Sequence, residues 1–268
     1  MNEAGIPDFV KAGSGPVTVY LLHGGYGGKE YWARVMARLV ADGYRVIAWD
    51  APGYGISPLP DPFTLEGAAE ACVRLIEATG TRCNVVVGHS MGGLIAPKVH
   101  QLRPDLVQGV VVSATVASFG HLDRATQESF IAERVAPLDK GMRLDEAASA
   151  LVRTMMGPGA DGPEIDTVVG VVAQTPTPTF RAAIRAIVEY RAEAALDALD
   201  KPVLVIAGSL DPVGRPVDMK SLAAALRRSR YVEVEGTGHY AWAEKPAEYH
   251  SHLTRFLRDV AQDRGLTL

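Results

Sequence analysis

Short apolar runs alternate with longer amphipathic segments along most of the chain. Five runs rich in β-branched residues predict strands buried on both faces of a parallel sheet: 17–22, 45–49, 84–87, 107–112 and 203–207. A further, less apolar strand is expected at 231–234. Helical periodicity fills the intervals at 29–42, 64–79, 91–102, 216–228 and 246–263. This alternation predicts an α/β fold with a mostly parallel, doubly wound sheet covered by helices on both faces.

The alternation is interrupted once, between Thr115 and Pro202. The intervening stretch has helical periodicity broken by glycines and prolines, which predicts an all-helical insertion over 116–198. Residues 1–115 and 199–268 would then form the α/β core. Because open α/β sheets bind ligands at the carboxyl ends of their strands, we expect the insertion to cap that edge and to wall a pocket there.

Composition and charge exclude several classes of protein. The net charge is near −4 and the basic residues are scattered, which argues against nucleic acid or an anionic membrane as a partner. No targeting segment begins the printed sequence and no apolar run approaches the ~18 residues of a membrane span, so we expect a cytoplasmic protein. Cys72 and Cys83 are too few for a disulfide framework or a zinc site, and we interpret both as buried free thiols.

The strand at 84–87 leads into Gly88-His89-Ser90-Met91-Gly92-Gly93 and then into a helix. A G-x-S-x-G motif between a strand and a helix is typical of a nucleophile elbow, in which glycines permit a sharp turn that exposes the serine. The N-terminus of the following helix would face a developing negative charge. Glycine-rich turns of this kind also bind phosphate or serve tight packing, so the motif alone leaves those alternatives open.

A serine nucleophile needs a base, and the base needs an acid to orient it. Asp211 follows the strand at 203–207, and His239 lies in a glycine-rich loop after the strand at 231–234. Taken separately, the aspartate suggests a turn or a helix cap and the histidine an ordinary loop residue. The order serine, acid, histidine at successive strand ends instead predicts a Ser90–His239–Asp211 triad.

The oxyanion of a tetrahedral intermediate needs hydrogen-bond donors. The elbow offers the Met91 amide, and the loop His23-Gly24-Gly25-Tyr26-Gly27-Gly28 offers the Gly25 amide. We expect His23 to bond nearby backbone and the turn at 50–57 to support neighbouring loops, without a chemical role for either. The triad chemistry calls for no metal and no organic cofactor.

Taken together, five motifs resemble the α/β-hydrolase superfamily across nearly the whole chain: His23-Gly24-Gly25, Asp50-x-Pro-Gly-x-Gly-x-Ser57, Gly88-His-Ser-Met-Gly-Gly93, Gly208-x-x-Asp-Pro212 and Gly238-His239. The resemblance implies a serine hydrolase, esterase-like or lactonase-like, acting through an acyl-enzyme. Many members have two strands before the equivalent of Val17, but sixteen residues precede it here. That length fits one short strand, at 8–12, and implies that the first antiparallel edge strand is missing.

Particular residues argue for or against other activities of the superfamily. Ser90 argues against epoxide hydrolases and dehalogenases, whose nucleophile is acidic. C–C bond hydrolases of ring-cleavage products usually resemble Gly-Asn-Ser-Met-Gly-Gly and carry Trp after the catalytic histidine; His89 and Tyr240 stand at those positions. That activity stays open as an alternative because Arg181, Arg185 or Arg191 of the insertion could meet an acidic substrate; their simpler interpretation is a solvated helix face. A ligand-binding receptor that retains the triad is a further alternative.

The insertion also supplies apolar side chains for a pocket: Phe119, Phe130, Met142, Leu151, Met155, Met156 and Phe180. Most of them are expected to form the insertion's own core. We predict that a small apolar acyl or aromatic substrate contacts five residues: Tyr26, Phe119, Met155, Tyr240 and Trp242. The sequence leaves the oligomeric state open and is compatible with a homodimer formed through a sheet edge or the insertion.

Overall fold

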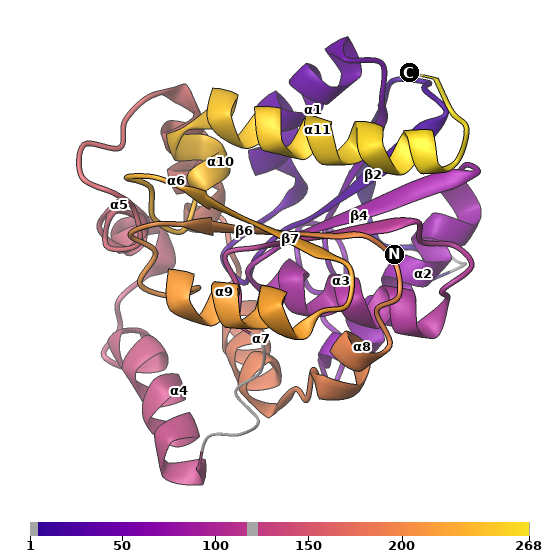
Figure 1. Ribbon diagram of the computed structural model, residues 1–268. Coiled ribbons are helices and arrows are strands. Elements are labelled where there is room, and N and C mark those ends of the chain that lie inside the picture. The colour runs from indigo at the N-terminus through magenta and orange to yellow at the C-terminus, as the bar shows by residue number, and fades with distance from the viewer. Residues whose placement is uncertain (1–4, 117–122, 268) are drawn as a thin grey trace.

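The protein is described from a computed structural model that covers residues 5–116 and 123–267 (Figure 1). Its strands form one seven-stranded sheet in the order β1-β3-β2-β4-β5-β6-β7. Neighbouring strands are parallel except for β1 and β3, which are antiparallel. The predicted α/β architecture with a mostly parallel sheet is confirmed.

The strands lie where the apolar runs predict them: β1 Phe9–Ala12, β2 Val17–Leu22, β3 Arg45–Trp49, β4 Cys83–His89, β5 Gly109–Ser113, β6 Val203–Gly208 and β7 Ser229–Val234. Every residue of β2, β4, β5 and β6 is buried, as expected for strands covered on both faces. β5 begins two residues later than predicted. There the Gln108 side chain, rather than a strand carbonyl, accepts the hydrogen bond of the Asn84 amide at 2.7 Å.

The residues before Val17 form a single short strand, as their number implies. β1 pairs with β3 from Phe9 opposite Trp49 to Ala12 opposite Val46 and ends the sheet on that side. Among the described residues one strand therefore precedes β2 where many members have two, as the sequence predicts. That strand is antiparallel to β3 and forms the edge of the sheet. β1 closes an edge that would otherwise present unpaired backbone groups of β3.

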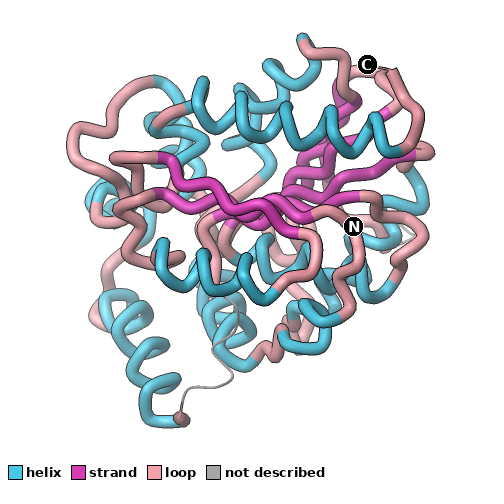
Figure 2. The backbone as a smooth tube through the Cα atoms, viewed as in Figure 1, coloured by secondary structure: helices cyan, strands magenta, loops and turns pink. Residues whose placement is uncertain are grey.

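Helices cover both faces of the sheet, as Figure 2 shows in cyan against the magenta strands. In the core they are η1 Lys29–Trp32, α1 Ala33–Ala41, α2 Leu65–Thr79, α3 Met91–Leu102, α9 Pro216–Ala225, α10 Ala241–Glu244 and α11 Pro246–Asp263. α1 and α11 lie on one face, and α2, α3 and α9 lie on the other (Figure 1). Burial of an apolar core on each face fixes the sheet between the two helical layers.

The described residues between β5 and β6 form five helices, which we call the cap: α4 Arg124–Asp139, α5 Leu144–Arg153, α6 Pro163–Ala173, α7 Thr177–Glu189 and α8 Glu193–Asp197. In Figure 1, α5 lies beyond the left end of the sheet, where β6 ends, while α4 lies at the lower left and α7 lies below α9. Phe180 is fully buried in a small apolar cluster with Leu138, Leu144 and Ile184, so the cap has a core of its own. Phe119 lies outside the described residues.

Two further expectations concern burial and membrane contact. Cys72 and Cys83 are buried free thiols, as predicted. Across the described residues, no helix is both long enough and apolar enough to cross a membrane.

Candidate active site

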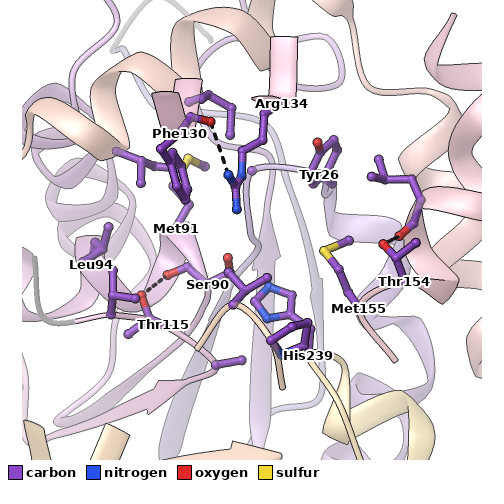
Figure 3. A pocket seen from close by; sticks show the side chains of 18 residues that line it. Tyr26, Ser90, Met91, Leu94, Thr115, Phe130, Arg134, Thr154, Met155 and His239 are labelled. Atoms are coloured by element: carbon purple, nitrogen blue, oxygen red, sulfur yellow. Dashed lines mark hydrogen bonds between the residues drawn. The ribbon is translucent and has the colours of Figure 1, made fainter. Parts of the chain in front are cut away.

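Ser90 stands at the junction of β4 and α3 with φ 53° and ψ −115°. A positive φ is unfavourable for a residue with a side chain and is found where the surrounding structure imposes it. Here a Cβ at Gly88 would collide with the Gly92 carbonyl, so the turn accepts only glycine at that position. The backbone of Ser90 is fixed on both sides, because its amide donates to Ser113 O at 2.9 Å and its carbonyl accepts from the Thr115 hydroxyl at 2.8 Å (Figure 3).

The imidazole of His239 is hydrogen-bonded to the carboxylate of Asp211. The His239 Nδ1 atom lies 2.9 Å from Asp211 Oδ2 and 3.1 Å from Oδ1, and both side chains are buried. Because a carboxylate only accepts, Nδ1 carries the proton and Nε2 is free to act as a base. His239 and Ser90 line the same cavity (Figure 3). Their side chains are not hydrogen-bonded to each other here, and such bonds often tighten only when substrate binds.

The loop that carries His239 is tied to the cap by a carboxylate, Glu244 of α10. Glu244 accepts hydrogen bonds from three backbone amides: Gly157 at 2.7 Å, Gly238 at 2.9 Å and Tyr240 at 3.1 Å. The His239 amide itself donates to Met155 O at 2.6 Å. Sequence reasoning missed Glu244, although an acidic residue in the first turn of a helix directly after a glycine-rich loop is a recognisable capping signal.

Two further histidines lie beneath the site, and both are buried. His23 Nδ1 lies 2.8 Å from Gly24 O, and Nε2 accepts from the Ala51 amide at 3.0 Å. Burial lowers the pKa of His23, so its ring is neutral and serves the backbone, as expected. Burial, and next the nearby His239, also lower the pKa of His89, whose ring centroid is 4.8 Å from that of His239. The neutral His89 ring packs against the imidazole of His239 and supports its position.

Asp50 also has the supporting role that the sequence suggests. Its carboxylate accepts from the Lys29 amide at 2.8 Å and pairs with the Lys29 ammonium. Ser57, at the end of the same turn, accepts from the Asp8 amide at 3.1 Å. The turn at 50–57 thus joins β1 to the loop after β2 and lines no part of the cavity around Ser90.

The amides of Gly25 and Met91 both border the cavity. Neighbouring amides are used in structural hydrogen bonds: Gly24 N–H to Tyr31 Oη at 2.7 Å, Ser90 N–H to Ser113 O at 2.9 Å and Gly92 N–H to His23 O at 3.1 Å. Within the described part of the chain, no acceptor takes the Gly25 or the Met91 amide. These two donors are therefore available to a ligand, as the predicted oxyanion hole requires.

The cavity has a volume of about 330 Å³ and is mostly apolar. Tyr26 and Met155 line it, and the Tyr26 ring stacks on Phe180 with a centroid distance of 4.3 Å. Tyr240 and Trp242, which we expected to contact substrate, do not line it. Both are almost fully buried in the core; Trp242 packs 4.8 Å from Trp32, between centroids. The direction of α10 explains this, because it carries the two side chains beneath the histidine rather than into the cavity.

Most of the cap side chains that line the cavity were not singled out as substrate contacts. They come from three helices: Phe130 and Arg134 of α4, Leu151 of α5, and Ile184 and Ile187 of α7, with Thr154 following α5. The three arginines considered as ligands for an acidic substrate lie elsewhere. Arg185 and Arg191 are exposed, and Arg181 forms an ion pair with Asp139 at 2.6 Å. They belong to a solvated surface, whereas Arg134 is the arginine inside the cavity.

Comparison with known proteins agrees with this geometry. The family model described as "Alpha/beta hydrolase family" matches residues 19–251. The chain is 30% identical over 269 residues to a pimeloyl-(acyl-carrier protein) methyl ester esterase of Neisseria meningitidis serogroup A, covering 98% of this chain and 82% of that one. It is 28% identical over 256 residues to BpoC of Mycobacterium tuberculosis, provisionally named a non-heme bromoperoxidase, with coverage of 92% and 96%.

Among solved structures, a thermophilic esterase from Thermogutta terrifontis superposes with a TM-score of 0.82 at 26% identity, over 94% of this chain and 93% of that one. The sheet order, the strained serine and the family match over most of the length agree with one another. The chain therefore belongs to the alpha/beta hydrolase family and is a hydrolase.

Proposed function

We propose that this hydrolase cleaves a carboxylic ester or lactone through a covalent acyl-enzyme on Ser90. One observation carries the proposal: a serine held at positive φ shares a cavity with a buried His239–Asp211 pair and two unused amides. The names of two relatives, a methyl ester esterase and a thermophilic esterase, support the same class of substrate.

In the proposed reaction, Ser90 Oγ attacks the carbonyl carbon while its proton passes to His239 Nε2. The carbonyl oxygen becomes an oxyanion, which the Gly25 and Met91 amides stabilise. Collapse of this intermediate expels the alkoxide leaving group, which takes the proton from His239. Asp211 holds the imidazole in the required tautomer and stabilises its charged form. Every proton in this half-reaction is handled by the chain's own residues.

The second half-reaction regenerates the serine. Water attacks the acyl carbon and gives a proton to His239, and the same two amides hold the second oxyanion. Collapse then breaks the ester bond to Ser90 Oγ, which recovers its proton as the carboxylic acid leaves. The sequence as written consumes one water and uses no cofactor. The apolar cavity walls favour a small acyl or aromatic group as the part of the substrate that is enclosed.

The test is hydrolysis of p-nitrophenyl esters from acetate to octanoate by the parent protein and by Ser90→Ala. The parent should turn over repeatedly, and Ser90→Ala should lose at least about 10⁴-fold in kcat because the nucleophile is gone. Ser221→Ala is the matched control, since Ser221 lies on α9 and bonds only Val217 O at 2.9 Å. Turnover that survives in Ser90→Ala, or a folded parent that cleaves none of these esters, would reject the proposal.

A further inference from the structure

Arg134 is the one cationic residue among the described residues that line the cavity around Ser90, and no aspartate or glutamate lines it. Its side chain descends from α4, and Figure 3 shows the guanidinium pointing into the cavity, on the side where Ser90 and His239 lie. The remaining cap side chains in the wall are aliphatic or aromatic, apart from the hydroxyl of Thr154. A positive charge thus stands alone in an apolar wall that faces the reacting groups.

The guanidinium is held in place by its own helix. Its central carbon lies 3.3 Å from the centroid of the Phe130 ring, and one of its nitrogens donates to Phe130 O at 3.2 Å. Stacking of a guanidinium on an aromatic face leaves its edges free for planar, two-point recognition of a carboxylate. The side chain is therefore oriented before any ligand binds, which lowers the entropic cost of binding one.

Three other arginines of the cap form ion pairs with acidic side chains, whereas no ion pair among the described residues involves Arg134. Arg124 pairs with Glu128 at 2.7 Å, Arg143 with Asp145 at 2.6 Å and Arg181 with Asp139 at 2.6 Å. Within the part of the chain that the structure describes, no carboxylate oxygen lies within 4.0 Å of the Arg134 guanidinium. Burial lowers the pKa of Arg134, although a guanidinium keeps its proton in proteins. Glu133, its neighbour on α4, attracts the guanidinium without forming an ion pair with it, and a partly desolvated cation that lacks an ion-pair partner favours the binding of an anion.

A second cavity adjoins the one around Ser90 at Arg134. It has a volume of about 510 Å³, lies between α4 and α5 and shares four lining residues with the first: Tyr26, Arg134, Leu151 and Thr154. A substrate that extends from Ser90 toward this second cavity passes the guanidinium. The two cavities together offer a mostly apolar path with one positive charge, Arg134, along it. The second cavity also has one carboxylate in its lining, Glu146, which lies 3.8 Å from the Arg143 guanidinium.

We propose that Arg134 binds a free carboxylate of the substrate, so that the preferred substrate is an ester or lactone bearing a carboxylate group separated from the scissile bond by an apolar chain. This inference rests on the proposed function. It names the class of substrate that an apolar cavity with one fixed guanidinium selects. A bidentate pair between guanidinium and carboxylate supplies both orientation and affinity.

The test compares p-nitrophenyl esters that differ only at the far end of the acyl chain. The adipate and suberate monoesters end in a carboxylate, whereas the hexanoate and octanoate esters of the same lengths end in a methyl group. Butyrate esters of ω-hydroxy acids form a second arm, in which the carboxylate lies on the alcohol side. The measured quantity is kcat/KM for each substrate, with Ser90→Ala subtracted as background.

The parent should prefer the carboxylate-bearing member of each pair in at least one arm. Arg134→Met retains much of the apolar stem but loses the charge, and it should lower kcat/KM for the carboxylate esters by about 10- to 100-fold, the range expected for a hydrogen bond to a charged group. The neutral esters should lose clearly less than the carboxylate esters, because they accept no charge-assisted hydrogen bond from the guanidinium. Arg134→Lys should recover only part of the preference, because lysine lacks the planar fork. Arg185→Met, on the exposed face of α7, is the matched control.

The outcomes separate this inference from the proposed function. Serine-dependent turnover of neutral esters without a carboxylate preference overturns the role of Arg134 and leaves the esterase proposal standing. An equal loss on charged and neutral esters in Arg134→Met also overturns it, because such a loss reports damage to the cap. If no ester is cleaved, adipate binding to Ser90→Ala, measured by calorimetry, decides the matter: binding that Arg134→Met abolishes supports the anion site, and absence of binding rejects it.

Discussion

The wall of the cavity formed by the sheet edge carries Ser90, His239 and two unused amides, whereas the wall formed by the cap carries apolar side chains and one cation, Arg134. Groups on the first wall are fixed by short hydrogen bonds to strand-end backbone, such as Ser90 N–H to Ser113 O at 2.9 Å. Groups on the second wall come from three helices and are placed by helix packing. In the proposed mechanism, the sheet edge supplies the chemistry and the cap selects the substrate.

The two walls are not independent, because the loop bearing His239 is bonded to the segment that follows α5. The Met155 carbonyl accepts the His239 amide at 2.6 Å, and Glu244 bridges Gly157 to Gly238. Placement of the base therefore depends on the cap as well as on the sheet. The separation between catalytic groups on the sheet edge and substrate-selecting groups on the cap is therefore clear at Ser90 and less clear at this junction.

The largest loss of kcat between the two walls is expected on the sheet-edge wall, for Asp211→Asn. An asparagine amide facing Nδ1 favours the wrong imidazole tautomer, so kcat should fall by about 10⁴-fold with the fold intact. The rate of p-nitrophenyl ester hydrolysis measures this loss for the parent and the variant. Asp218→Asn removes a carboxylate that pairs with Arg215 at 2.7 Å on α9 and should be nearly neutral. A similar loss in both variants, or none in Asp211→Asn, would contradict the assignment of the acid.

A smaller effect is expected where the two walls meet, for Glu244→Gln. The amide NH₂ of glutamine cannot accept a hydrogen bond, so at least one of the three backbone amides loses its partner. We expect kcat to fall by about 10- to 100-fold, on the scale of a charge-assisted hydrogen bond, while KM changes little. Steady-state kinetics of the folded variant should show this split.

Glu235→Gln, an exposed change on the same loop, is the control for Glu244→Gln. Urea denaturation should show a lower free energy of unfolding for Glu244→Gln as well, because a buried amide is left unsatisfied. A lower free energy of unfolding with an unchanged kcat would mean that Glu244 stabilises the loop without positioning His239. The coupling between the two walls would then be structural only.

The sequence was sufficient for the sheet-edge wall because its signals are local. A strand that ends in Gly88-His89-Ser90 forces the elbow, and the parallel sheet brings Asp211 and His239 to the same edge. The cap wall could not be predicted in the same way. Arg134 follows Phe130 by one helical turn on a helix of mixed polarity, and only the packing of α4 against α7 turns that side into the cavity.

The error at Tyr240 and Trp242 has the same origin. Their proximity to His239 in sequence suggested contact with substrate, but a four-residue helix, Ala241–Glu244, turns them into the core. Glu244 was missed because its partners, among them Gly157, are distant in sequence. Residues whose roles depend on contacts across the fold are beyond what local spacing can predict.

The most direct test of the central claim is covalent labelling with diethyl p-nitrophenyl phosphate, an ester analogue that leaves a stable diethylphosphoryl group on an activated serine. The account predicts release of one p-nitrophenol per chain, loss of esterase activity in parallel, and a mass increase of one diethylphosphoryl group on the peptide containing Ser90. Labelling of a different residue, or an active esterase that remains unlabelled at Ser90, would contradict it.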